Sequence, residues 1–226
     1  MFKIYSNKLL ISLYQILSYL QLMLFRNKTL IISDSHGRLL FSLKNSSNKL
    51  LLYKAQPTFK LNFILFWVNL TSYKFYSKDF SKWIYKIISK YKANNLIISC
   101  GEIDIRYYAN LKEAEDISIV ANKFCEKIIE LSKIKNLNIF YIIPIAPCRK
   151  LSKKKEKGRI PFEGTYYQRL ESFEKYKKII FHRLNNLTSV KIIEPSYQCN
   201  ENICDHDKDY IHFKKIQNLK ILENFN

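Results

Sequence analysis

The sequence contains few glycines, cysteines and histidines. Its 226 residues include four glycines, five cysteines and four histidines. An odd number of cysteines scattered over a chain of this size argues against a disulfide framework and favours a reducing compartment, so we expect free thiols and a cytoplasmic protein. Cys199, Cys204, His206 and His212 lie close in sequence, but their spacing differs from the paired ligands of structural zinc sites. We therefore expect no metal ion and no other cofactor.

Acidic residues are scarce relative to basic ones. The chain has 38 Lys and Arg against 19 Asp and Glu, which gives a formal net charge of +19 at pH 7. Clustered basic residues bind phosphate by releasing counterions, but here the lysines are spread along the whole chain. The one dense run, "KLSKKKEKGR" at residues 150–159, is typical of a solvated loop. We expect no nucleic-acid partner, while binding of a polyanion or a membrane surface stays open as an alternative function.

No cleavage site of the A-x-A type follows the apolar amino-terminal segment. Residues 9–25, "LLISLYQILSYLQLMLF", carry no charge and are flanked by Lys8 and Arg26. The segment is at the short edge of a membrane-spanning length, and the first predicted strand begins almost at once, so we expect no removed signal peptide. Two interpretations of residues 1–26 stay open: a helix that packs on the domain, and a helix that lies in or anchors to a membrane.

Short apolar runs alternate with amphipathic stretches along the rest of the chain. The 47% hydrophobic content suffices for one core, and we expect residues 27–226 to form one domain. The segment 56–78 is ambiguous between helix and loop. The alternation predicts β-α-β units, a parallel sheet and a doubly wound three-layer sandwich of the α/β class. The predicted strands are 29–33, 49–53, 95–99, 138–145 and 190–194, and the predicted helices are 79–92, 113–135 and 166–187.

Polar residues follow the first, third and fifth predicted strands. Ser35 follows the first strand, "CGEID" at residues 100–104 follows the third, and Asp209 and His212 follow the fifth. In open parallel sheets, sites form outside the carboxyl ends of the strands. A serine at a strand-to-helix turn is well placed to be a nucleophile. Because Asp209 precedes His212 by three residues, both side chains lie on one face of a turn, where the carboxylate can orient the imidazole as a base.

These segments resemble a known family. "SDSH" with Ser35, "GEID" with Gly101, and "DYIH" with Asp209 and His212 occur in the order and positions of the first, third and fifth blocks of SGNH hydrolases, also called GDSL-type esterases. The resemblance spans roughly residues 28–215 and is closest to bacterial members whose third block reads G-E-I-D-x-R. It implies a flavodoxin-like three-layer fold with a five-stranded parallel sheet, and metal-free chemistry on acyl esters. Ser35 would attack the carbonyl, His212 would act as base and then acid, and Asp209 would orient His212.

The resemblance also implies an oxyanion hole, and here the sequence departs from the family. Besides the N–H of the nucleophile, the family uses a glycine of the second block, but this chain has no glycine between Gly37 and Gly101. The nearest polar candidates there are Asn62 and Asn69. The asparagine position of the third block holds Ile103, whose side chain donates no hydrogen bond.

Glu102 and Arg106 have two open interpretations. Arg106 could compensate for the missing donors with its fixed cationic fork, and Glu102 could also contact substrate. Alternatively, the two side chains pair with each other as part of the loop structure. With Gly101 beside them, they complete the predicted oxyanion and substrate-binding residues.

Other residues near these motifs have structural interpretations. Ser35 is also suited to cap the following helix. His36 and His206 are expected in exposed loops, His182 is expected to be a structural histidine within a helix, and Cys100 is expected to pack like a small apolar residue.

Three functions remain in competition. The leading hypothesis is an SGNH-type serine esterase or acyltransferase acting on a small acyl ester, with an O-acyl group on a carbohydrate suggested by the bacterial relatives. The second is an SGNH fold with an impaired oxyanion hole that binds a glycan or a partner without turnover. The third is the binding of a polyanion or a membrane surface through the basic charge.

Overall fold

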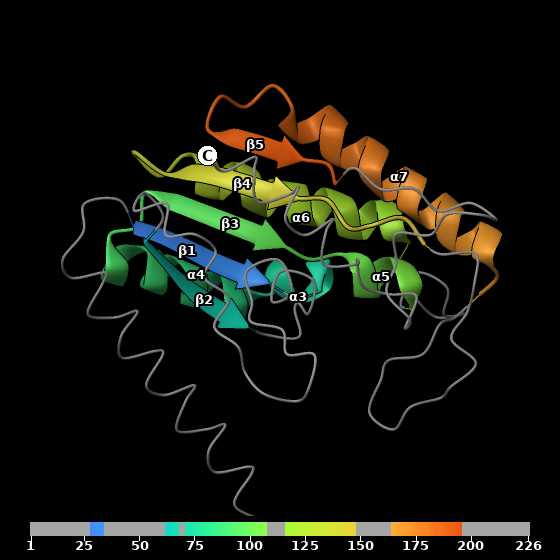
Figure 1. Cartoon of the computed structure of the whole chain (residues 1–226), viewed down its shortest axis with the longest axis horizontal. Coiled ribbons are helices and arrows are strands. Elements are labelled where there is room, and N and C mark those ends of the chain that lie inside the picture. The colour runs from blue at the N-terminus through green and yellow to red at the C-terminus, as the bar shows by residue number, and fades with distance from the viewer. Residues whose placement is uncertain (1–27, 34–61, 68–70, 108–115, 148–163, 196–226) are drawn as a thin grey trace, which may run out of the picture.

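The described part of the chain contains a five-stranded parallel sheet (Figure 1). The computed structural model describes residues 28–33, 62–67, 71–107, 116–147 and 164–195, with side chains omitted for Lys28 and for 62–67. The strand order is β2-β1-β3-β4-β5, and all four strand pairs are parallel. The strands are β1 (Lys28–Ser33), β2 (Asn62–Trp67), β3 (Asn95–Ser99), β4 (Asn138–Ile142) and β5 (Val190–Ile193).

The strand order reverses at β1. From β1 the chain first moves outward to β2 and then returns past β1 to β3, after which β4 and β5 are added on the far side. The connections from β2 to β5 all move across the sheet in one direction, so right-handed crossovers place their helices on one face. The connection from β1 to β2 lies outside the described residues. The predicted α/β class and the five-stranded parallel sheet are confirmed.

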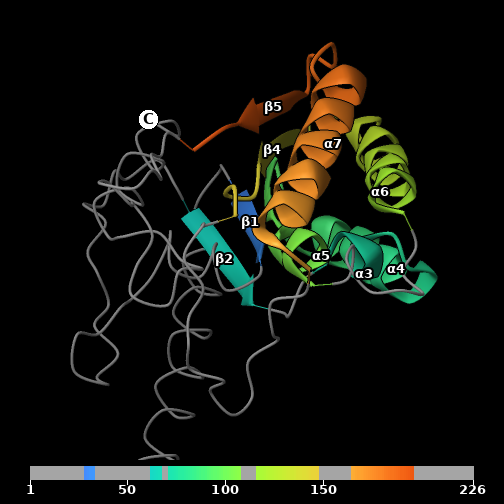
Figure 2. The same ribbon diagram turned by 90° about the vertical axis from the view of Figure 1, so that its right-hand side faces the viewer.

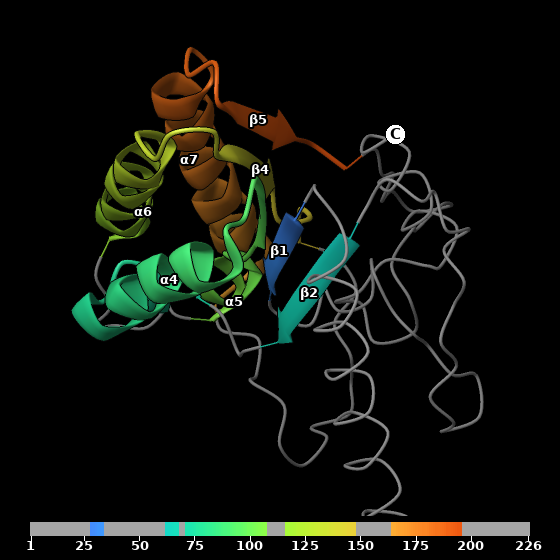
Figure 3. The same cartoon turned by 90° about the vertical axis from the view of Figure 1, so that its left-hand side faces the viewer.

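Helices occupy the connections between strands. Figures 2 and 3 view the sheet from its two ends, and in both α4, α6 and α7 lie on the same face. The short helices α3 and α5 lie beyond the carboxyl ends of the strands (Figure 1). The helices are α3 (Ser72–Phe75), α4 (Lys78–Tyr91), α5 (Glu102–Arg106), α6 (Ile117–Ser132) and α7 (Tyr166–Leu184).

Local capping determines where the long helices begin and end. The Asp116 side chain accepts from the Ser118 N–H at 2.6 Å and starts α6, four residues later than the predicted helix. At α7, Thr165 and Gln168 form a reciprocal capping box. Helix α4 ends at Tyr91; the C-cap residue Lys92 has a left-handed backbone (φ 48°), and its N–H bonds carbonyls of the last turn.

Strands β1 and β3 are buried on both faces, as their continuous apolar composition predicts. In β1, Leu30 and Ile32 belong to the main core between the sheet and the helices, while Ile31 points to the other face. All three side chains are at most 1% exposed. The same alternation occurs in β3, where Leu96 and Ile98 join the main core and Ile97 faces the other way.

Strand β2 lies where the sequence pattern predicted no strand. The sheet position beside β1 is occupied by 62–67, which lies within the segment 56–78 that the pattern left between helix and loop. That segment also contains α3. The predicted strand at 49–53 lies outside the described residues. The hydrophobic period alone does not show which of several short apolar runs forms a strand of the sheet. Pairing between segments far apart in the sequence decides this.

No helix within the described ranges has the length and apolarity needed to cross a membrane. The amino-terminal segment 9–25, with its two open interpretations, lies outside those ranges.

Phe124 provides a test of the core. Its ring is fully buried in α6 and contacts the rings of Phe75 and Tyr141, each with a centroid distance of 5.0 Å. We expect Phe124→Ala to lower the free energy of unfolding by about 3–5 kcal/mol in urea titration, because the cavity adds to the lost burial. Ile119→Ala, on the same helix but 46% exposed, is the control and should change it by less than about 0.5 kcal/mol. Equal losses in the two variants would contradict the described packing.

Candidate active site

The carboxyl ends of β1 and β3 lie side by side. Ser33 ends β1 and pairs in register with Ser99, which ends β3. The sequence order reverses between these strands, and in doubly wound sheets such a switch point opens a crevice outside the carboxyl ends. The chain therefore leaves β1 and β3 at neighbouring points of the same edge of the sheet.

Gly101 forms the turn after β3. Its φ of 111° lies in the left-handed region, where glycine is favoured. A Cβ atom there would approach Pro144 Cγ to 2.9 Å and the Tyr176 hydroxyl oxygen to 3.1 Å. Both the backbone and the surrounding side chains thus require glycine, which explains why a chain with four glycines has one here.

A chain of buried hydroxyl groups lies against this turn. The Tyr141 hydroxyl donates to the Cys100 carbonyl at 2.9 Å, and its oxygen is 2.9 Å from the Tyr176 hydroxyl. The Tyr176 oxygen is in turn 2.7 Å from the Ser72 hydroxyl. Each hydroxyl has one proton, so the arrangement that satisfies the Cys100 carbonyl has Ser72 donating to Tyr176 and Tyr176 donating to Tyr141.

Burial keeps both phenols protonated. It is the main cause that raises the pKa of Tyr141 and of Tyr176 well above 10. The hydroxyl chain therefore stays neutral through the physiological range, and it links β4, α7 and α3 to the end of β3.

The carboxyl group of Asp104 is buried beside these hydroxyl groups. It is 1% exposed, and its oxygens accept from the backbone N–H groups of Ser72 at 2.6 Å and Tyr73 at 3.4 Å. Desolvation outweighs these hydrogen bonds and raises the pKa of Asp104 from 3.8 to about 6. The side chain thus changes charge close to neutral pH.

Glu102 and Arg106 pair with each other across one turn of α5. Arg106 Nε donates to Glu102 Oε1, and Arg106 Nη2 donates to Oε2 at 3.2 Å. Both side chains are less than 10% exposed. This geometry is a bidentate fork, which is among the stronger ion-pair arrangements in proteins. Ile103, between them, is 7% exposed.

The structure brings together part of the predicted site. Gly101, Glu102 and Arg106 lie at the carboxyl end of β3, as expected. The proposed triad of Ser35, Asp209 and His212 lies outside the described residues, as does Asn69.

Asn62 is a correction. It begins β2 and pairs with Lys28 at the start of β1, so it lies at the amino edge of the sheet. Five residues of extended chain, about 17 Å, separate it from the carboxyl edge. Asn62 is therefore removed from the oxyanion candidates.

His182 and Cys100 both lie within the described residues. His182 lies exposed in the last turn of α7, which is the end of that helix nearer the amino edge of the sheet, so it is remote from Gly101. Cys100 is 1% exposed and belongs to the main core, which confirms the prediction that it packs like a small apolar residue.

Sequence reasoning missed the buried polar residues that lie next to the turn at Gly101. Asp104 was noted only as part of the polar run after β3, and Ser72, Tyr141 and Tyr176 received no role. The acidic residue within "GEID" was an available signal for Asp104, but its partner Ser72 lies 32 residues away in the sequence.

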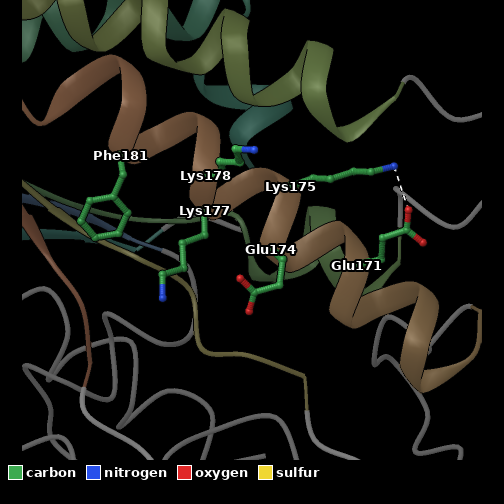
Figure 4. Close-up of a pocket in the computed structure, with 6 residues that line it drawn as sticks. All are labelled: Glu171, Glu174, Lys175, Lys177, Lys178 and Phe181. Atoms are coloured by element: carbon green, nitrogen blue, oxygen red, sulfur yellow. Dashed lines mark ion pairs between the residues drawn. The ribbon is translucent and has the colours of Figure 1, made fainter.

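A hollow of about 480 Å³ opens along the outer side of α7 (Figure 4). It is lined by side chains of both charges together with Phe181, and Lys175 reaches toward Glu171 at 3.0 Å. Of the predicted site residues that the structure describes, Gly101, Glu102 and Arg106 do not line it. Within the described ranges, no three His, Cys, Asp or Glu side chains gather as a metal site would require, and Cys199, Cys204, His206 and His212 lie outside those ranges.

The fold is similar to that of solved esterases. No protein-family model matches the chain, and no curated protein matches its sequence. A carbohydrate acetylesterase from Sinorhizobium meliloti matches with a TM-score of 0.55 and 14% identity, over 88% of this chain and 96% of the other. An acetyl xylan esterase matches with the same score and identity, over 88% and 97%. An aryl esterase from M. smegmatis matches with a TM-score of 0.52 and 11% identity, over 88% and 96%. The chain thus has the α/β architecture of these esterases.

The Glu102–Arg106 pair yields a stability prediction. Arg106→Met leaves the Glu102 carboxylate buried without its partner, so we expect a loss of about 3–5 kcal/mol in the free energy of unfolding. The double variant Glu102→Gln with Arg106→Met should recover part of this loss. Lys175→Met, which breaks the exposed pair with Glu171, is the control and should leave urea unfolding unchanged. A double variant no more stable than Arg106→Met would contradict the pairing.

Asp104 yields a prediction of pH dependence. Because its pKa is raised from 3.8 to about 6, the folded protein binds this proton more tightly than the unfolded chain does. The resulting stabilisation is fully present below pH 3.8 and is lost as the pH rises through 6, with a total on the order of 3 kcal/mol. The Tm of the wild type minus that of Asp104→Asn should therefore increase by several degrees between pH 7.5 and 4.5.

Asp116→Asn is the matched control for this measurement. The Ser118 N–H lowers the pKa of Asp116, so its contribution to stability is lost as the pH falls. The corresponding Tm difference should change in the opposite direction. A flat difference for Asp104→Asn would show that this carboxyl group titrates normally.

Proposed function

We propose that the protein is an SGNH-type serine esterase that hydrolyses or transfers a small acyl ester through Ser35, His212 and Asp209. The observation that carries this proposal is the position of the turn at Gly101, which lies beside the end of β1 at the switch point of the sheet. The fold is similar to that of solved esterases, and in the sequence the segments that continue from these two strand ends carry "SDSH" and "GEID".

Ser35 is the nucleophile in this proposal. It follows Ser33, the last residue of β1, by two residues, and two residues span at most about 7 Å of chain. Because Ser33 pairs with Ser99, two residues before Gly101, this short distance supports a position of Ser35 near the turn after β3. His212 removes the proton of Ser35 and later returns it to the leaving alcohol, and Asp209 orients the imidazole.

The oxyanion would be stabilised by backbone N–H groups, with Ser35 as one donor. The N–H groups of Ser72 and Tyr73 bond Asp104, so a second-block donor would come from the chain just before them. We assign Glu102 and Arg106 to holding α5 in shape, because their side chains form a buried bidentate pair.

An acylated carbohydrate is the substrate class that we favour. Two of the structural neighbours are named as a carbohydrate acetylesterase and an acetyl xylan esterase, and the resemblance to bacterial SGNH proteins points the same way. One observation favours a second candidate, a protein that binds such a glycan without turnover. Ile103 occupies the asparagine position of the third block and offers no side-chain donor, and losing one such donor costs roughly 100- to 1,000-fold in rate.

The test of function is hydrolysis of p-nitrophenyl acetate together with labelling by a fluorophosphonate probe. We expect turnover and labelling by the wild type, and a loss of at least about a thousandfold in kcat for Ser35→Ala, because no other group supplies the attacking oxygen. Asp209→Asn and His212→Ala should lose activity to a similar extent.

Ser77→Ala is the matched control for Ser35→Ala. Ser77 occupies the N-cap position of α4, and its replacement removes a serine from a helix start without touching the site. Activity in this variant should equal that of the wild type. Absence of both turnover and labelling in the wild type would leave the glycan-binding protein as the better interpretation.

A further inference from the structure

Asp104 joins the chain segments that follow two different strands. It comes five residues after the end of β3, whereas the N–H groups that it accepts belong to Ser72 and Tyr73, at the start of α3 after β2. Strands β2 and β3 are the two neighbours of β1 in the sheet. The carboxylate therefore connects the segments that follow the strands on either side of β1, whose own continuation carries Ser35.

The group that makes this connection is a buried carboxylate, and burying its ionised form lowers the stability of the fold. The carboxylate is 1% exposed, and among the described residues no basic side chain pairs with it. Burial raises the pKa of Asp104 to about 6, so the ionised form is disfavoured in the fold and yet predominates above that pH. A carboxylate kept in such a place, beside a catalytic crevice, is typical of a group whose charged form has a task.

The groups packed around Asp104 leave it as a distinct titrating group. On α7, Tyr176 is neutral in this range because burial raises its pKa well above 10. From α3, Ser72 faces it through its backbone N–H group and its hydroxyl, and Tyr73 faces it through its backbone N–H group. On α5 itself, the buried charges of Glu102 and Arg106 are paired with each other.

We propose that Asp104 is a positioning residue for the ester reaction: its ionised carboxylate holds the start of α3 against the turn at Gly101 and so keeps the chain on both sides of the nucleophile in place. The inference rests on the proposed function. An ionised carboxylate accepts hydrogen bonds from both N–H groups. In a protonated carboxyl group, one oxygen is a hydroxyl, which is itself a donor and a weaker acceptor for the N–H group that faces it. Protonation therefore weakens one of the two contacts.

The test compares the pH dependence of p-nitrophenyl acetate hydrolysis in the wild type, Asp104→Asn and Asp116→Asn between pH 5 and 8.5. In the wild type, two groups must be deprotonated for full activity: His212, which acts as the base, and Asp104, which holds the start of α3. A plot of log kcat against pH should therefore fall below pH 6 with a slope steeper than one. For Asp104→Asn at pH 8 we expect kcat at least about tenfold lower, KM within about threefold, and a slope of one in the acid limb.

Asp116→Asn is the matched control, because it also removes a carboxylate that accepts a backbone N–H at a helix start, but on α6. It should keep the wild-type kcat and slope. An Asp104→Asn variant with wild-type kcat and slope would overturn the inference while leaving the esterase proposal intact. A wild type with neither turnover nor fluorophosphonate labelling would overturn the esterase proposal and the inference with it.

Amide hydrogen exchange of the wild type gives a second readout that does not depend on the folding of a variant. After correction for intrinsic rates, the amides of Ser72 and Tyr73 should lose at least about tenfold in protection between pH 7.5 and 5, relative to the amide of Ser118 in α6. Unchanged relative protection would overturn the inference.

Discussion

Ser33 and Ser99 are paired in register at the ends of two adjacent parallel strands, and the candidate site depends on this pairing. A shift of one residue would reverse the faces of every side chain in the strand, which burial on both faces opposes. It would also move the turn at Gly101 relative to the continuation of β1. The apolar sheet thus sets the position of the polar chemistry, although none of its core side chains takes part in that chemistry.

Behind the turn, polar groups replace apolar packing. Ser72, Tyr141 and Tyr176 link α3, β4 and α7 to the Cys100 carbonyl, and Asp104 bonds the first N–H groups of α3. Hydrogen bonds impose directions that apolar contacts do not, so a buried polar network selects one arrangement of the elements that it joins. Such a network is costly when incomplete, and here each of the three hydroxyls has a hydrogen-bond partner.

Sequence patterns predicted the parts of the fold that are encoded locally. Four of the five strands and the three long helices lie close to their predicted positions, because buried parallel strands and amphipathic helices have distinctive periods. The strand at 62–67 was missed because several apolar runs competed and only pairing with β1 selects among them. Asp104 was missed as a site residue for a related reason, since its role is defined by Ser72, and spacing patterns do not report contacts across 32 residues.

Strand β5 forms one edge of the described sheet, and its sequence affects whether two molecules can associate through that edge. The unpaired backbone groups of an edge strand can recruit a strand from a second molecule and so begin aggregation. Strand β5 is only four residues long, and the exposed Lys191 interrupts its apolar side chains. A second strand added there would have to accommodate a lysine charge within a very short ladder. This edge is therefore a poor template for intermolecular sheet growth.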